Sequence, residues 1–146
     1  MNTTTATSFD TTPSAKTERR GLNVALWAVQ GLLAFAFLAA GLMKLTTPIE
    51  TLAESMAWVD GKGGLVRFIG LAEFAGGLGL ILPAALRIKP KLTPAAAGGL
   101  VIVMVLAALT HVGMGDFAGM VPSLVLGSLA AFVVWGRTKA SPIAPR

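Results

Sequence analysis

Four apolar stretches, each long enough to cross a lipid bilayer, constrain this chain more than any other feature of its sequence. A hydrocarbon core of about 30 Å is spanned by about 20 helical residues. Lipid offers no hydrogen-bond partners, so a spanning segment is either a helix or a strand of a closed barrel, and these stretches lack the apolar–polar alternation of barrel strands. The sequence therefore predicts an all-α fold, an antiparallel bundle of four transmembrane helices. The stretches are Leu22–Leu45, Leu65–Leu82, Pro94–Met114 and Phe117–Trp135.

Composition narrows the chemistry that the chain can perform. Its 146 residues suit one domain, and with 54% hydrophobic and 13% charged residues a soluble core is disfavoured. The absence of cysteine from the sequence excludes thiolate catalysis, cysteine metal sites and iron–sulfur clusters. The one histidine, His111, cannot supply two axial haem ligands within one chain. The sequence also lacks phosphate-binding loops, zinc-protease motifs and nucleophile elbows, so we expect no catalytic residue set and no metal site.

The basic residues are concentrated on one side of the predicted bundle. If four helices span, nine of the 12 lysines and arginines fall on the same side. Because positive charge is retained in the cytoplasm, both termini are predicted inside and the connectors 46–64 and 115–116 outside. The formal charge of +5 is then explained by orientation and anionic lipid, and no nucleic-acid partner is expected. The nine residues are Lys16, Arg19, Arg20, Arg87, Lys89, Lys91, Arg137, Lys139 and Arg146.

The segments outside the spans have their own signals. Residues 1–20, rich in threonine and serine without apolar periodicity, predict a disordered cytoplasmic tail, followed by a transmembrane domain over 21–137 and a cytoplasmic tail over 138–146. A cleaved signal peptide is the alternative for the first stretch, which is longer than a usual signal core. Apolar residues at helical spacing in Ile49–Asp60 predict a short amphipathic helix on the outer surface. The second span is expected to end at Pro83.

Ionisable residues within or at the ends of the spans are the candidate site. A charge at bilayer depth costs roughly 2.5–3.5 kcal/mol, so such a group faces the bundle interior and has a partner. One interpretation is a polar pocket, open to the outside, for a quinone head group, a small anion or a proton path. The other is a structural ion pair of Glu73 with Lys44 or Arg67, with His111 in ordinary interfacial hydrogen bonds. Both stay open, and the cofactor is unknown, with a quinone as the one candidate. The candidate residues are Lys44, Arg67, Glu73 and His111.

Four sequence motifs resemble those of the DoxX-like membrane proteins. They are GLMKL at the end of the first span, RFIGLAEFAGGLGLILP in the second, LTPAAAGGLVIVM opening the third and ALTH ending it. The resemblance extends from about Leu32 to Arg137 and implies a four-helix protein of the bacterial inner membrane. The family takes its name from a membrane subunit of a thiosulfate:quinone oxidoreductase, and other members are associated with redox stress. The four candidate residues occupy the family's polar motif positions, for which the resemblance supplies no catalytic role.

Three functions follow as hypotheses. The first is a non-catalytic accessory or anchor subunit of a redox, quinone-linked membrane system, which requires a membrane or redox partner protein. The second is a small-solute or proton-coupled transporter that uses Glu73, with a homo-oligomer compensating for the small size of the chain. The third is an enzyme on a membrane-soluble substrate, and if the chain has enzymatic activity at all, we expect it as the membrane subunit of a quinone-linked oxidoreductase.

Overall fold

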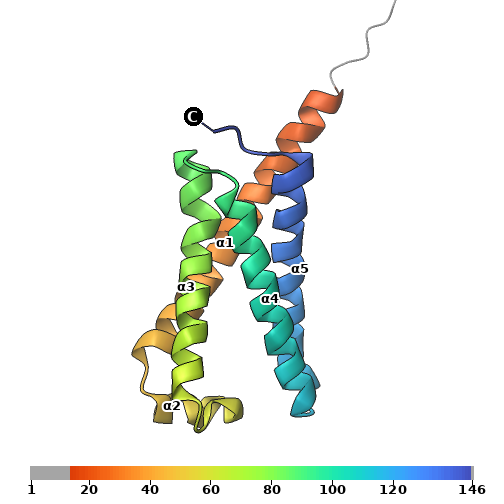
Figure 1. Ribbon diagram of the computed structural model, residues 1–146. Helices are drawn as coiled ribbons and strands as arrows, with labels where there is room; N and C mark the ends of the chain where they lie inside the picture. The colour runs from red at the N-terminus through yellow and green to blue at the C-terminus, as the bar shows by residue number, and fades with distance from the viewer. Residues whose placement is uncertain (1–13, 146) are drawn as a thin grey trace, which may run out of the picture.

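The computed structural model describes residues 14–145 and shows an antiparallel bundle of four long helices (Figure 1). Within that part of the chain every regular element is helical, which confirms the predicted fold class. Each connector between consecutive long helices is short, except for the one that holds two small helices. The elements are α1 (Ser14–Thr46), α2 (Ile49–Ser55), η1 (Ala57–Val59), α3 (Gly63–Leu86), α4 (Leu92–Gly113), α5 (Phe117–Trp135) and η2, a π-helical turn (Gly136–Ala140).

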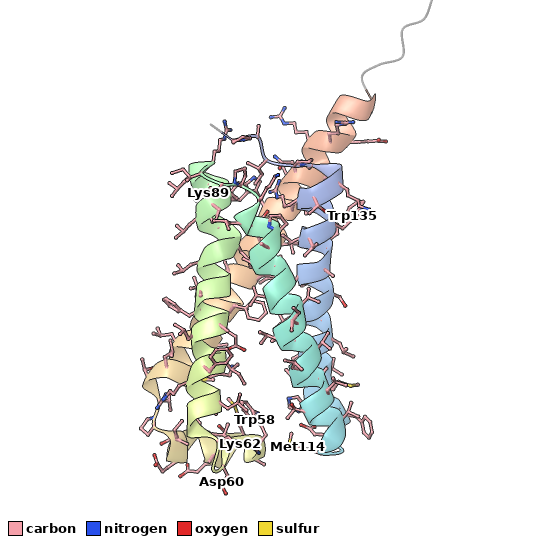
Figure 2. All side chains as sticks on the ribbon, viewed as in Figure 1. Trp58, Asp60, Lys62, Lys89, Met114 and Trp135 are labelled. Atoms are coloured by element: carbon pink, nitrogen blue, oxygen red, sulfur yellow. The ribbon has the colours of Figure 1, made fainter. Side chains whose placement is uncertain are left out.

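The helices pack as two pairs, α1 with α3 and α4 with α5, joined by contacts between α3 and α4 and between α1 and α5. Figure 1 shows α1 crossing the bundle obliquely while α4 and α5 run side by side. The α3–α4 turn with Lys89 and the end of α5 with Trp135 lie at one end, here called the basic end (Figure 2). Asp60, Lys62 and Met114 lie at the opposite end, here called the α2 end. The first and last described residues therefore both lie towards the basic end, as an even number of spans requires.

The outer surface of the bundle is suited to lipid. All four long helices are long and apolar enough to span a membrane, yet only 17–33% of each apolar window is buried inside the bundle. Phe35, for example, is 75% exposed on the surface of α1. Helices that are apolar on all sides bury their outward faces in a bilayer. The interior is filled by residues from all four helices, with Phe37, Leu80, Leu100 and Val133 among the most buried.

Two predicted boundaries differ from the structure. Residues 14–20, expected in a disordered tail, form the first turns of α1, because they are mostly good helix formers and a helix extends at little cost once it exists. Residues 1–13 of that predicted tail lie outside the described residues. Pro83 does not end the second span but lies inside α3, which continues to Leu86. Proline is tolerated within membrane helices because neighbouring groups satisfy the freed carbonyl. The helix ends instead at Arg87, in the left-handed conformation with φ 55°.

The expected outer amphipathic helix is present but shorter. It ends at Ser55, and after an extended Met56 the chain forms the single turn η1. Leu52 of α2 and Val59 of η1 pack on Val66 at the start of α3, in a small apolar cluster separate from the main core. This cluster fixes the connector against the α2 end of the bundle.

Candidate functional site

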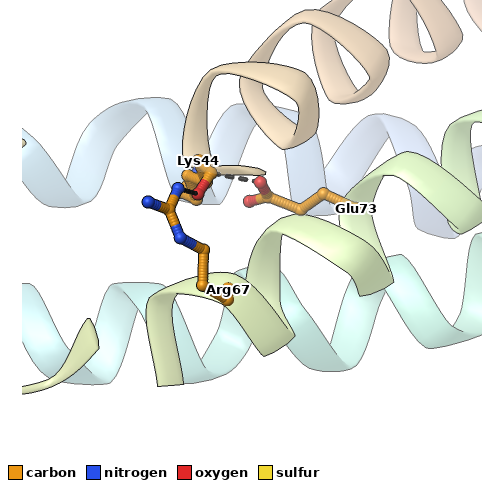
Figure 3. A network of polar contacts seen from close by, with 3 residues as sticks. All are labelled: Lys44, Arg67 and Glu73. Atoms are coloured by element: carbon orange, nitrogen blue, oxygen red, sulfur yellow. Dashed lines mark hydrogen bonds and ion pairs between the residues drawn. The ribbon is translucent and has the colours of Figure 1, made fainter. Parts of the chain in front are cut away.

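A close crossing of α1 and α3 positions the candidate residues. A Cβ atom added to Gly41 would lie 2.7 Å from the carbonyl oxygen of Gly70 and 2.7 Å from the backbone nitrogen of Phe74. A Cβ atom on Gly70 would lie 2.8 Å from Cβ of Lys44. The two backbones can come this close only because both positions are glycine. The crossing places Lys44, one turn after Gly41 on α1, against Glu73, one turn after Gly70 on α3 (Figure 3).

Lys44 and Glu73 form a buried ion pair between these helices. Lys44 Nζ donates to Glu73 Oε2 at 2.7 Å, and the two side chains are 11% and 5% exposed. A buried pair of this kind contributes little net stability compared with apolar residues, whereas removal of one partner is costly because it leaves an uncompensated charge. The pair therefore specifies how α1 and α3 meet. The sequence left Lys44 and Arg67 as possible partners of Glu73, and the structure pairs Glu73 with Lys44.

Arg67 joins the same cluster through the backbone. Its Nη1 donates a hydrogen bond to the carbonyl oxygen of Lys44 (Figure 3). That carbonyl belongs to the last turn of α1, where backbone acceptors have no partner within the helix. Arg67, in the second turn of α3, thus satisfies a carbonyl at the end of α1 beside the ion pair. Lys44, Arg67 and Glu73 are named here the Lys44 cluster.

His111 takes part in a different structure, the cap of α5. Its Nδ1 lies 2.9 Å from Asp116 Oδ2, and Asp116 Oδ1 accepts a hydrogen bond of 2.9 Å from the backbone N–H of Gly119. Asp116 is the N-cap residue of α5, where aspartate is favoured. The Gly119 N–H and then His111 hold the pKa of this exposed carboxyl below its ordinary value of 3.8. Three of the four predicted residues thus form one cluster, and the hydrogen bond of the fourth closes the α4–α5 turn.

A second polar network, at the basic end, was not identified in the sequence. Arg137, in the π-helical turn η2, is only 4% exposed. Its Nε donates to Gln30 Oε1 at 2.6 Å and its Nη1 to Asn23 Oδ1 at 2.7 Å. The Gln30 amide in turn donates to the carbonyl oxygen of Leu80 on α3 at 2.6 Å. The guanidinium also lies over the Trp27 ring, 5.3 Å from its centroid, in a cation–π contact.

The model of the DoxX-like family matches residues 28–133, most of the chain. The chain belongs to the DoxX-like family. No curated protein and no solved structure matches it. The match includes the whole Lys44 cluster, His111 and Gln30, and it ends before Arg137. This DoxX-like protein is therefore a membrane protein with four apolar helices.

Two cavities of the DoxX-like bundle lie away from the candidate residues. One, of about 310 Å³, lies between α3 and α4 and is lined by small and apolar residues that include Ala72, Gly76 and Gly99. Gly76 approaches Leu100 of α4, whereas Gly70 faces α1. The other lies at the basic end. None of the four candidate residues lines either cavity, and their role in binding a ligand stays a prediction.

The network around Arg137 has a signal in the sequence, although a weak one. Gln30 is an uncharged amide well inside the first span, and a buried amide requires partners. In an antiparallel bundle the start of the first span and the end of the fourth lie at the same level, which brings Gln30 near Arg137. Arg137 was instead counted among the cytoplasmic charges, because it follows Trp135 and Gly136 at the expected end of the last span. The π-helical turn that carries it into the bundle has no recognisable pattern in the sequence.

Proposed function

We propose that this protein is a non-catalytic accessory or anchor subunit of a redox membrane system, linked to the quinone pool. One observation carries the proposal: the ionisable groups of the Lys44 cluster are bonded to one another, through the ion pair and through the Lys44 carbonyl. Groups arranged in this way hold helices in register rather than present a reactive atom to a substrate. The redox assignment rests on the resemblance to a family whose namesake is a subunit of a quinone-linked oxidoreductase.

The proposal includes an orientation and a compartment. The basic end carries Lys89, Lys91 and Lys139, whereas the α2 end carries most of the acidic residues. Positive charge next to membrane spans is retained on the cytoplasmic side. We therefore assign the basic end to the cytoplasmic face of a bacterial inner membrane, with both termini inside. Labelling of a cysteine introduced at Ser141 from the cytoplasmic side only would support this orientation, and labelling from outside would contradict it.

Assembly in native membranes tests the accessory role. Membranes from cells that express the chain at its natural level are solubilised in mild detergent, and the complex is sized by native electrophoresis. We expect the 15.0 kDa chain to run in a larger complex with a protein that carries a redox cofactor. Deletion of the chain should lower the quinone-reduction rate of the membranes. Recovery of the chain alone, with an unchanged rate after deletion, would overturn the proposal.

A variant that keeps the helix contact but removes both charges separates assembly from chemistry. Lys44→Met with Glu73→Met replaces the ion pair by apolar side chains of similar length. An accessory subunit with this double change should still assemble and still restore quinone reduction in the deletion strain. A double variant that assembles but restores no quinone reduction would show that the ion pair takes part in the reaction, and the non-catalytic role would be refuted.

The second candidate function is a proton-coupled transporter, and the burial of Glu73 within a span favours it. Buried carboxylates in membrane spans are frequent in proton relays. The purified chain in proteoliposomes with an internal pH-sensitive dye provides the test, with Glu73→Gln compared to Glu54→Gln. Glu54 is an exposed glutamate on α2, so its substitution changes the net charge equally. Proton flux that is lost in the first variant while its helical circular dichroism is kept, and that is unchanged in the second, would replace the accessory role by transport.

A further inference from the structure

The cavity at the basic end is lined by positively charged residues only, among the charged residues that the structure describes. It has a volume of about 850 Å³ and lies between the α3–α4 turn, the start of α4, the end of α5 and the C-terminal segment. Figure 1 shows that segment running from α5 across the basic end towards α3. Its cationic lining residues are Lys89, Lys91 and Arg137, and no carboxylate of the described chain lines it. This basic-end pocket is separate from the Lys44 cluster, so the inference rests on the proposed orientation but not on the proposed accessory role.

Arg137 gives the pocket a buried charge that no carboxylate among residues 14–145 balances. Its hydrogen-bond acceptors are neutral oxygens: the side-chain oxygens of Gln30 and Asn23, and the Ser141 carbonyl at 3.3 Å. Within the described residues it forms no ion pair. Buried charges in proteins are ordinarily paired, because an isolated ion loses its hydration without compensation. An anion bound in the pocket would supply a counter-charge that the described residues do not.

One nitrogen of the same guanidinium is also unbonded. Arg137 Nη2 is buried and has no hydrogen-bond partner in the part of the chain that the structure describes, whereas Nε and Nη1 are both engaged. The hydroxyl of Thr93, between the lining residues Leu92 and Pro94, is buried without a partner as well. Each such group costs free energy unless an acceptor or donor reaches it. A phosphate oxygen is an acceptor that arginine favours, through charge-assisted hydrogen bonds.

The rest of the lining is apolar and continues into the membrane-facing helices. Leu92 from α4, Val134 from α5 and Ile143 from the C-terminal segment are among the apolar residues that line the pocket beside the cations. Trp135, next to Val134, is half exposed at the level expected of an interfacial anchor. A ligand that fits this lining has an anionic head at the basic end and hydrocarbon directed along α4 and α5.

We propose that the basic-end pocket binds the phosphate group of an anionic phospholipid, with Arg137 as its deepest contact and Lys89 and Lys91 at its rim. Free inorganic phosphate carries the same anionic group but has no hydrocarbon that could contact the apolar wall of the pocket. Basic pockets between membrane helices on the cytoplasmic side are known to select such head groups. The bound lipid would fix the C-terminal segment against the bundle and balance the charge of Arg137.

Native mass spectrometry of the full chain in detergent tests the proposal. The probes are phosphatidylglycerol as the anionic lipid, phosphatidylcholine as the zwitterionic lipid, and inorganic phosphate as competitor. We expect phosphatidylglycerol to bind in preference to phosphatidylcholine and to stay bound in millimolar phosphate. Equal binding of the two lipids would overturn the proposal. Displacement of the lipid by phosphate would assign the site to the free anion and would also overturn it.

Three substitutions connect the binding to this pocket. Lys89→Gln and Lys91→Gln alter exposed side chains, so the fold is kept, and each is expected to weaken phosphatidylglycerol binding about fivefold. Lys139→Gln is the matched control, because Lys139 is exposed in the same region and does not line the pocket. A loss of affinity in the control equal to that in the other two would indicate unspecific attraction to basic residues, and the pocket would be refuted as the site.

Discussion

The two ends of the bundle bury a cation in opposite ways. At the α2 end, Lys44 has a carboxylate 2.7 Å away, supplied by the neighbouring helix. At the basic end, Arg137 is buried at least as deeply but is bonded to neutral oxygens alone within the described chain. The first cluster is complete without any other molecule. The second lacks a counter-charge, which makes it the end of the molecule where a bound anion would stabilise the fold.

The difference has its origin in how each cation is positioned. Lys44 is brought to Glu73 by a glycine crossing that leaves no space for another group between the helices. Arg137 is carried by a π-helical turn, and Gly136 before it lies directly against Leu26 of α1. Irregular turns of this kind occur often where a side chain is aimed at a ligand. The Lys44 cluster at the α2 end therefore fixes the contact between α1 and α3, whereas the pocket at the basic end binds an anionic group.

The largest expected effect is that of Glu73→Gln. The substitution leaves the Lys44 ammonium buried without a counter-charge and should lower the free energy of unfolding by about 3–5 kcal/mol. Unfolding of the purified protein in mixed detergent, followed by circular dichroism, measures the loss. Glu54→Gln, which removes an exposed carboxylate, is the charge-matched control and should change stability by less than about 0.5 kcal/mol. Equal stability of the two variants would show that the ion pair does not stabilise the contact between α1 and α3.

The next effect in size concerns the crossing itself. Gly41→Ala places a Cβ atom 2.7 Å from backbone atoms of α3, which cannot move aside as a side chain can. The helices must separate, and we expect a loss of about 1–3 kcal/mol together with a longer Lys44–Glu73 distance. Gly98→Ala on α4, where an added Cβ meets nothing within 4 Å, should instead be neutral or stabilising by up to about 1 kcal/mol. Detergent unfolding of both variants in parallel provides the comparison.

A smaller effect, and one that depends on lipid, is expected at the basic end. Arg137→Gln removes the unbalanced charge while it keeps a hydrogen-bonding side chain, so in detergent alone it should cost less than Glu73→Gln, about 1–2 kcal/mol. Phosphatidylglycerol at about 100 times its Kd should stabilise the unsubstituted protein by about 2.7 kcal/mol and leave the variant unchanged. Thermal unfolding with and without the lipid measures both. Equal stabilisation of the unsubstituted protein and Arg137→Gln by the lipid would show that Arg137 does not bind it, and the basic end would then not differ from the α2 end in needing an anion.

The sequence predicts the bundle well because the bilayer imposes simple rules on it. The fourth span, Phe117–Trp135, coincides with α5, which begins after the N-cap residue Asp116 and continues as η2 to Ala140. The second span was expected to stop at Pro83, a rule taken from soluble helices that does not hold within a membrane. The pairing of Glu73 was predictable for the same reason as the spans, because a charge at that depth requires a partner.

What the sequence could not predict depends on the direction in which a side chain points. His111 and Lys44 lie at the same end of the bundle, as expected, but His111 bonds to Asp116 of the α4–α5 turn and not to the Lys44 cluster. Arg137 was expected among the cytoplasmic charges after the last span, whereas the structure buries it in a turn whose Gly136 packs on Leu26. The burial of Arg137 accompanies a tertiary contact that a pattern of apolar and charged residues does not encode.

The smallest expected effect tests a charge that, unlike Lys44 and Arg137, is exposed. Hydrogen bonds from Gly119 N–H and His111 lower the pKa of Asp116, so the ionised carboxylate is favoured by folding. The stabilisation by this cap is complete above the ordinary pKa of 3.8 and is lost as the pH falls from there through the lowered pKa of the folded state. We expect the hydrogen-exchange protection of the Gly119 amide, corrected for its intrinsic rate, to fall in that window until it matches that of Asp116→Ala. Protection of Gly119 that is unaffected by either change would mean that the α4–α5 turn is held by helix packing alone.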